Sequence, residues 1–453
     1  MYSDGEACKR SDILYLTWKR NLDRHLPELA QQLAPRREGE PPVETAYYSQ
    51  GAFNRCYRGR LRAGSDVLIR FPVLGRVSFR REKLADEVSV MEYVAQHTSI
   101  SVPKILRVGT CAWGPFMVTS FVEGNLLSEC LKAPSGPTEL EVLNPDISAS
   151  TLKQAYRGMA ETLIELSKCQ FPRIGAVTRD KAGSWGVGKR AVSLNMNQLV
   201  ALGNYPPQEL GKHTFATATD YFVALAQDHM RHLETQRNDA IDDEADCKKK
   251  YVARCLFLDI ARTFSTTQNN GPFRLFSEDL RPSNVIVGPG LEIRCVIDWE
   301  FSYVCPAEFT YCSPWWLLLA HPDDWQGDFD DFLAQYLPRH NIFLGVLQES
   351  EDEVIKRGAL LESQRLSERM AQSMHNGDFW FCLAARSSFA FDDIYWRYID
   401  PKYHGEFTSV EDRVKLLSSE EQARLEGFVQ LKMQQARERK LEEHWTLDEI
   451  LAA

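Results

Sequence analysis

The sequence predicts an α+β protein with two lobes, a small β-rich lobe followed by a large, mainly helical one. Residues 47–123 contain short apolar runs separated by glycine-containing turns, with one helical stretch among them. Beyond residue 124, apolar residues recur at helical spacing over several segments. A single hairpin-like stretch, residues 276–300, interrupts these helices. The expected domains are an N-terminal helical extension and linker (1–46), the small N-lobe (47–123) and the large C-lobe (124–453).

Composition limits the classes of function. The chain has 453 residues, 44% of them hydrophobic, so it can bury a sizeable core. Its net charge of −10 argues against a nucleic-acid binder, which usually carries a basic surplus. The eleven cysteines form no CxxC pair, the N-terminus is polar, and the apolar run 315–320 is too short to span a membrane. We expect a cytoplasmic protein without a nucleic-acid or membrane partner.

The first lobe is built from short strands. Apolar residues at helical spacing predict a helix over 13–33, and the segment PRREGEPP is typical of a linker. The stretch YYSQGAFNRCYRGRLRAGSDVLIRFPV then indicates three strands, and a helix follows over 79–97. The segments PKILRVGTCAWG and PFMVTSFVEG indicate two more strands around a Trp-Gly turn.

The second lobe is mainly helical. Helical periodicity covers residues 150–168 and 215–240. A long charged helix is expected near the C-terminus, where Ser418 followed by Glu421 fits a capping box.

The hairpin FSEDLRPSNVIVGPGLEIRCVIDWE carries polar residues at a spacing with chemical meaning. Asn284 follows Asp279 by five residues, and Asp298 comes fourteen residues later. Gly288-Pro289-Gly290 is the turn between two apolar runs, and a hairpin brings its two ends together. Asn284 and Asp298 can therefore face one metal ion, with Asp279 and the cation Arg281 just ahead of them. This is the arrangement that phosphoryl transfer needs. The alternative is a surface hairpin in which Asp279 and Ser283 cap a loop and Asp298 is a turn residue.

Three other motifs favour structure over chemistry. The segment GSWGVGK at 183–189 lacks the Ser or Thr that completes a P-loop, and we interpret it as a turn. His229 and His232 have no third metal ligand nearby in the sequence, so a pair of partly exposed histidines is expected. The cluster Pro314-Trp315-Trp316 is more typical of core packing at a helix start than of ligand stacking.

A kinase-like mechanism makes further demands upstream. A turn over the phosphates is predicted at Gln50 to Asn54, with nucleotide contacts from Gly51, Ala52, Phe53 and Asn54. The strand VLIRF offers the cation Arg70, and the next helix offers Glu87 as its acidic partner, with Glu82 and Glu92 as alternatives. The segment FMVTSFVEG is the expected hinge between lobes, where Thr119, Ser120, Phe121 and Val122 would meet the adenine.

Taken together, GAFNRCYRGRL, IRFP, DLRPSNVIV, IDWEFSY, PAEFTYCSPWWLLL and FWFCLAARSSFAFDDIYW resemble the aminoglycoside phosphotransferase family in its broad sense, specifically its large fungal branch. The resemblance covers about residues 45–405 and implies a protein-kinase-like two-lobed fold that uses ATP and Mg²⁺ on a small-molecule acceptor. It implies Asp279 as the catalytic base and Asn284 and Asp298 as magnesium ligands. Arg70 and Glu87 would be the strand–helix ion pair.

Two departures from the family pattern keep a second function open. Ser277 stands where the family usually has His, and Arg70 stands where it usually has Lys. The alternatives are thus an ATP-dependent small-molecule kinase and a kinase-like binding protein with little turnover. A protein kinase is disfavoured, since no Ala-Pro-Glu segment follows IDWE. A cationic acceptor is suggested by a group of acidic residues near the hairpin, namely Glu278, Glu300, Glu308, Asp323 and Asp324.

Overall fold

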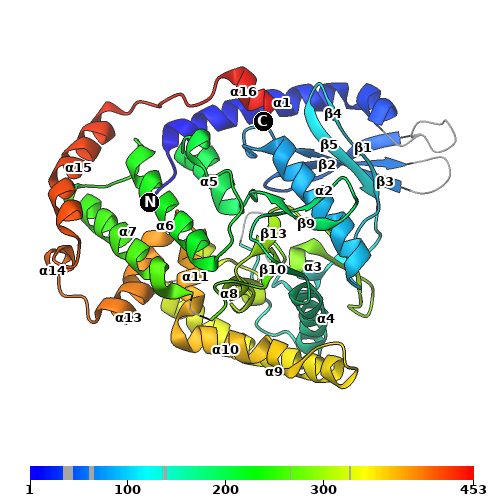
Figure 1. The fold of residues 1–453 in the computed structure, drawn as a ribbon. Coiled ribbons are helices and arrows are strands. Elements are labelled where there is room, and N and C mark those ends of the chain that lie inside the picture. Colours follow the sequence, from blue (N-terminus) through cyan, green and yellow to red (C-terminus); the bar gives the residue numbers. More distant parts are fainter. Residues whose placement is uncertain (34–43, 61–65, 135, 137–139, 266, 326–327) are drawn as a thin grey trace.

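The computed structural model describes residues 1–33, 44–60, 66–134, 136, 140–265, 267–325 and 328–453. It contains a small lobe with an antiparallel sheet and a large helical part, which confirms the predicted α+β class (Figure 1). The predicted linker PRREGEPP lies outside the described residues. No helix among the described residues is long and apolar enough to cross a membrane.

The small lobe is a five-stranded antiparallel sheet in the order β1-β2-β3-β5-β4. All five strands and the helix between them were predicted. Their bounds are β1 Glu44–Gln50, β2 Asn54–Arg60, β3 Asp66–Pro72, α2 Arg80–His97, β4 Ile105–Cys111 and β5 Gly114–Ser120.

Helix α1 (Gly5–Leu33) covers one face of this sheet, and it starts eight residues earlier than the sequence pattern indicates. Its apolar side chains pack on the sheet in one cluster, which includes Trp18 and Leu22. Because side chains alternate along a strand, Ile69 and Phe71 of β3 point into that cluster while Arg70 points the other way, toward the large lobe. Helix α1 also reaches the large lobe, where the backbone N–H of Asp4 donates to the carbonyl of Leu202 at 2.7 Å.

The large part is built from helices around one apolar core. Figure 1 shows α4 and α9 lying together at one end, with α6, α7 and α15 at another. Helix α15 begins with the predicted capping box of Ser418 and Glu421. The helices are α3 Leu127–Leu131, α4 Ala149–Ser167, α5 Leu194–Gly203, α6 Ala218–Thr235, α7 Glu244–Phe264, α8 Ala307–Thr310, α9 Phe329–Lys356, α10 Ser367–Asn376, α11 Asp378–Arg386, α12 Phe391–Ile394, α13 Asp400–His404, α14 Val410–Val414 and α15 Ser419–Glu438. The last helix, α16 Leu447–Ala452, returns to the small lobe, where Ile450 packs against the cluster under α1.

Short strands in this part form the hairpin predicted over residues 285–297. Strands β11 and β12 pair on either side of the predicted turn, and β10 pairs with β13 just beside them. The strands are β6 Asn125–Leu126, β7 Gln170–Phe171, β8 Ala176–Arg179, β9 Trp185–Lys189, β10 Phe273–Ser277, β11 Val285–Val287, β12 Ile293–Val296 and β13 Ser302–Cys305.

Two of the predictions made for the three motifs that favour structure over chemistry are wrong. Residues 185–189, expected in a turn, form strand β9, which pairs with β8 and is held against α2 by a 2.6 Å ion pair between Lys189 and Asp86. His229 and His232, expected to be partly exposed, are fully buried on α6. Burial lowers the pKa of both, that of His229 to about 3, so they are neutral core residues. Trp316 is buried as expected, in a short 3-10 helix, Trp315–Leu318.

Candidate active site

The site predicted from the sequence gathers around one cavity of about 950 Å³ between the two lobes. It is lined by the turn 50–54, by Arg70, by residues 119–122 of the predicted hinge and by the loop after β10 that carries Asp279. Every predicted site residue except Glu87 lies in its wall. Those residues are Gly51, Ala52, Phe53, Asn54, Arg70, Thr119, Ser120, Phe121, Val122, Asp279, Arg281, Asn284 and Asp298.

Asp279 lies in the loop after β10, where its carboxylate is held from two sides. The side-chain amide nitrogen of Asn284 donates to Oδ2 of Asp279 at 2.9 Å and to the backbone carbonyl of Asp279 at 2.8 Å. The guanidinium Nε of Arg281 lies 3.0 Å from its Oδ1. Burial, with a contribution from Asp298, raises the pKa of Asp279 to about 6, although Arg281 and Asn284 oppose this. The carboxylate is thus positioned as a base that is still ionised at neutral pH.

Asn284 and Asp298 stand at the two ends of the β11–β12 hairpin, as the spacing predicts. The N–H of Ile297 donates to the carbonyl of Asn284 at 2.8 Å and so ties the ends together. Asp298 has a left-handed backbone with φ 59°, a conformation that non-glycine residues adopt mainly where the surroundings impose it. The amide nitrogen of Asn284 donates to Asp279, so the amide oxygen of Asn284 is the atom that could bind a cation. An amide oxygen and a carboxylate are ligands that Mg²⁺ accepts.

Arg70 forms two ion pairs, one within the small lobe and one that crosses to the large lobe. One guanidinium nitrogen lies 2.6 Å from Glu87 on α2, and another lies 2.6 Å from Asp298. Of the three acidic candidates on α2, Glu87 is therefore the partner, whereas Glu82 pairs with Arg190. Glu87 is buried behind the cavity wall and acts on the cavity through Arg70.

A second buried ion pair beside Arg70 was missed from the sequence. Lys83 lies one helical turn before Glu87 on α2, and its ammonium group contacts the carboxylate of Glu300. The two side chains are only 1% and 3% exposed. Asn54 joins them, donating to Glu300 at 2.8 Å while its oxygen lies 3.4 Å from Lys83. The signal was present, because residues four apart share one face of a helix.

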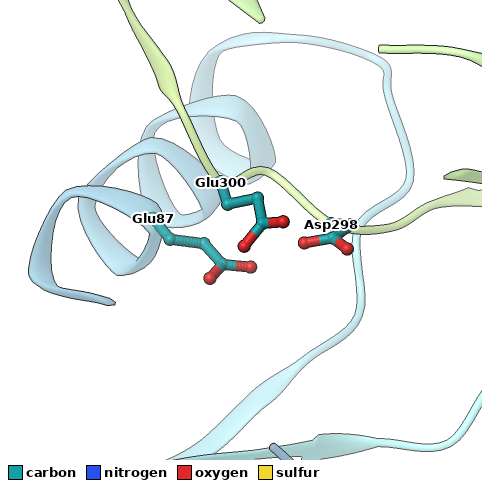
Figure 2. A group of neighbouring side chains, drawn as sticks. All are labelled: Glu87, Asp298 and Glu300. Carbon is teal, nitrogen blue, oxygen red and sulfur yellow. The ribbon is translucent and has the colours of Figure 1, made fainter. Parts of the chain in front are cut away.

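Figure 2 shows the carboxylates of Glu87, Asp298 and Glu300 turned toward one another, with oxygen atoms within 4.8 Å. Three carboxylates this close repel unless cations lie among them. Arg70 lies between two of them, and Lys83 contacts the third. A divalent cation at Asp298 would therefore compete with Arg70 for that carboxylate.

Glu278 takes part in bracing the catalytic loop, a role that the sequence did not reveal. Its carboxylate accepts a 2.6 Å hydrogen bond from the N–H of Leu194, at the N-terminus of α5, and a 2.8 Å bond from the hydroxyl of Tyr303. The positive end of a helix dipole favours such an anion. These bonds fix the residue just before Asp279, in the loop where Ser277 replaces the usual His.

The predicted nucleotide contacts, in the turn 50–54 and at residues 119–122, share the cavity wall with the β11–β12 hairpin. Leu68 from β3 and Ile286 from β11 add apolar surface to this wall. The turn at Gly51 is closed by a 3.0 Å bond from its N–H to the carbonyl of Asn54. At the tip of this turn, the ring of Phe53 packs edge-on against the ring of Phe301, with 5.1 Å between the two centroids. This contact joins the turn to the segment that directly follows the β11–β12 hairpin.

The acidic residues that suggested a cationic acceptor are mostly used inside the protein. Glu278 and Glu300 have the partners described above, and Glu308 is half-buried and accepts a hydrogen bond from the hydroxyl of Ser265. Asp324 is exposed at the cavity. The side chain of Asp323 lies outside the described residues. The structure thus removes most of the basis for that expectation.

A comparison with family models decides the family. The model of the phosphotransferase enzyme family matches residues 48–341, which is well over half of the chain. The chain belongs to the phosphotransferase enzyme family. Within this phosphotransferase, the matched segment contains the sheet, the catalytic loop and the metal-side hairpin, but neither α1 nor residues beyond 341.

Individual proteins are more distant. A curated relative, the clavilactone A biosynthesis cluster protein Y of Ampulloclitocybe clavipes, is 24% identical over 256 residues, or 54% of this chain. The match spans only 56% of that relative. An aminoglycoside 2′-phosphotransferase variant with GDP is 12% identical over 92% of this chain and 99% of its own, with a TM-score of 0.43. An amicoumacin kinase with AMP-PNP and Ca²⁺ is 15% identical over 91% and 93%, with a TM-score of 0.42.

Proposed function

We propose that this phosphotransferase moves the γ-phosphate of ATP to a hydroxyl group of a small molecule. The observation that carries the proposal is that one cavity gathers Asp279, which is ionised at neutral pH, the oxygen-bearing side chains of Asn284 and Asp298, the turn 50–54 and the segment 119–122. Such a site needs little covalent chemistry, because phosphoryl transfer depends on positioning and on charge stabilisation. The family match supports the reaction class.

In this proposal, Asp279 accepts the proton of the acceptor hydroxyl as its oxygen attacks the γ-phosphorus. The bond from γ-phosphorus to the bridging oxygen breaks, and ADP leaves. Asn284 and Asp298 would hold Mg²⁺, which neutralises charge on the phosphate oxygens when bound. Arg281, at the cavity mouth, would contact the transferred group, and the backbone of Thr119 to Val122 would meet the adenine.

Location, origin and domain organisation belong to the same proposal. The eleven cysteines are all free thiols, which supports a reducing compartment such as the cytoplasm. The relative in Ampulloclitocybe clavipes, named for a biosynthesis cluster, supports a fungal origin and a small-molecule acceptor. We keep the three expected domains, 1–46, 47–123 and 124–453, as part of the proposal.

The test is an assay of ADP release from ATP, with magnesium and a set of hydroxyl compounds, and of GDP release when GTP replaces ATP. We expect acceptor-dependent ADP release that Asp279→Asn reduces by about a hundredfold or more, because a positioned base contributes roughly 10²–10⁴-fold. Asp146→Asn, the same change at an exposed position, is the matched control and should leave the rate unchanged. Transfer that survives in Asp279→Asn, or absence of nucleotide binding at millimolar concentration, would refute the proposal.

A kinase-like binding protein with little turnover is the second candidate. One observation favours it: Arg70 is bound to both Glu87 and Asp298, so the strand cation is already neutralised and occupies one oxygen of the metal-ligand candidate. This function predicts saturable binding of nucleotide in a thermal-shift titration without ADP release for any acceptor. Turnover at about one per second or faster, a typical enzyme rate, would exclude it.

A further inference from the structure

Besides the predicted nucleotide contacts and the residues around Asp279, three further segments line the cavity. They are helix α5, the short helix 315–318 with the residues that follow it, and the end of α11 with the turn after it. We call this region the acceptor half. Its described residues are Leu194, Gln198, Leu202, Trp315, His321, Asp324, Arg386, Ser387, Phe389 and Ala390.

Charge is scarce in the acceptor half. Asp324 is the one carboxylate that its described residues contribute, and it is exposed to solvent. Arg386 is the one guanidinium, and it is already engaged: it stacks over the rings of Phe276 and Phe309 and neighbours Glu278. A multiply charged acceptor would lose its hydration here without finding a set of counter-charges.

Aromatic and aliphatic surface is plentiful instead. Trp315 and Phe389 are both half-buried, so part of each ring faces the cavity. Packing fixes both rings: Trp315 lies edge-on to His321 at 5.0 Å, and Phe389 lies edge-on to His232 at 5.0 Å. Leu194 and Leu202 of α5 add aliphatic surface, and Gln198 adds a neutral hydrogen-bonding group. Rigid rings beside a few neutral polar groups are typical of sites for flat apolar ligands.

A neighbouring cavity of about 900 Å³ shares Phe389 and Ala390 with the acceptor half. Its wall is mixed, because the rings of Trp325, Phe329 and Trp396 lie there beside charged residues of both signs. Phe389 and Ala390 lie beyond the segment that matches the family model. This part of the acceptor wall therefore lies outside the segment that matches the family model.

We propose that the acceptor is an uncharged aromatic alcohol or phenol that packs against Trp315 and Phe389 and presents its hydroxyl to Asp279. This inference rests on the proposed phosphotransfer, in which the acceptor oxygen forms a bond to the γ-phosphorus, its proton passes to Asp279, and ADP carries away the bonding electron pair. It replaces the cationic acceptor suggested by the sequence.

The test uses three probes with one ring system and different charges: 2-naphthalenemethanol, protonated 2-naphthylmethylamine and 2-naphthoate. Calorimetric titration into the full chain with magnesium and AMP-PNP gives each affinity. We expect the neutral alcohol to bind at least about tenfold more tightly than either ion. Trp315→Ala and Phe389→Ala should each weaken the alcohol by about threefold to tenfold, and Trp315→Phe should recover most of the loss. Phe407→Ala removes an exposed ring outside the cavity and should change nothing.

Several results would overturn this inference. They are equal or tighter binding of either ion, no saturable binding of the alcohol at millimolar concentration, and alcohol affinity unaffected by both ring deletions. A second arm follows phosphate transfer by phosphorus NMR. If the alcohol binds but is never phosphorylated, the inference of an aromatic ligand is supported and the proposed phosphotransfer is refuted. If only cationic acceptors are phosphorylated, the proposed phosphotransfer is supported and the inference of an uncharged aromatic acceptor is refuted.

Discussion

Lys83→Met tests whether the buried pair between Lys83 and Glu300 holds the two lobes together. Both side chains are almost completely buried, and one comes from α2 of the small lobe while the other follows the metal-side hairpin. Removing Lys83 leaves the Glu300 carboxylate with Asn54, at 2.8 Å, as its neutral hydrogen-bond donor. Breaking a buried pair in this way costs about 3–5 kcal/mol, a large part of the roughly 5–15 kcal/mol that stabilises a typical protein.

The size of the loss should depend on pH. Burial, and next the carboxylate of Asp298, raise the pKa of Glu300, and Lys83 opposes both. Without Lys83 the folded-state pKa rises further above its unfolded value, so the folded protein binds the extra proton. Stability is then present at low pH and is lost as pH rises through the folded pKa. Lys83→Met should therefore cost less at pH 5 than at pH 8.

The assay is urea denaturation at both pH values for four proteins: wild type, Lys83→Met, Glu300→Gln and the double variant. Adding Glu300→Gln to Lys83→Met should recover about half of the loss or more, because the stranded charge is gone. Lys104→Met, the same change at an exposed lysine, is the control. Equal destabilisation at both pH values, or a double variant no more stable than Lys83→Met, would refute the reasoning.

Three further predictions concern the site. Arg70→Lys should raise the affinity for Mg²⁺-ADP about threefold, because one ammonium group cannot hold both Glu87 and Asp298 as the guanidinium fork does, and the Asp298 carboxylate is then released for the metal. A magnesium titration followed by thermal shift measures this affinity, and an unchanged affinity would contradict the prediction. The Asp279 carboxyl should titrate near pH 6 in metal-free protein and at lower pH when Mg²⁺ is added, because a cation favours the ionised form; carbon-13 NMR measures both midpoints, and an upward shift would exclude a nearby metal. The free energy of unfolding should fall as pH drops below about 6.5, because buried His229 and His232 bind protons only after unfolding. The urea midpoint of His232→Gln should fall less over this pH range than that of the wild type. An equal fall in both proteins would mean that His232 contributes nothing to the pH dependence.

The parts of the site that follow from local spacing could be predicted from the sequence. The hairpin between Asn284 and Asp298 is determined by two apolar runs and a Gly-Pro-Gly turn, so its two ends had to meet. The direction of Arg70 follows from strand alternation, and its pairing with Glu87 follows from the position of that residue on the next helix.

The parts of the site that depend on packing between residues far apart in the sequence could not be predicted. Glu278 braces the loop through Leu194, more than eighty residues away, and nothing in the local pattern around either residue indicates this bond. The same holds for Phe389, which reaches the cavity only because α11 ends beside it. Helical periodicity placed His229 and His232 on a helix, but it could not show that the helix is covered by protein on that side as well.

Helix α1 has a consequence for how this chain can be shortened or recombined. The family match begins at residue 48, yet the sheet inside it is covered by Trp18, Leu22 and other apolar residues that come before that point. A chain trimmed to 48–341 would expose the apolar face of β3 and β5 to water and would lose Phe389 as well. Exposed apolar patches of this kind promote aggregation. The unit that can be transplanted as one folded piece is therefore longer at both ends than the segment that matches the family model.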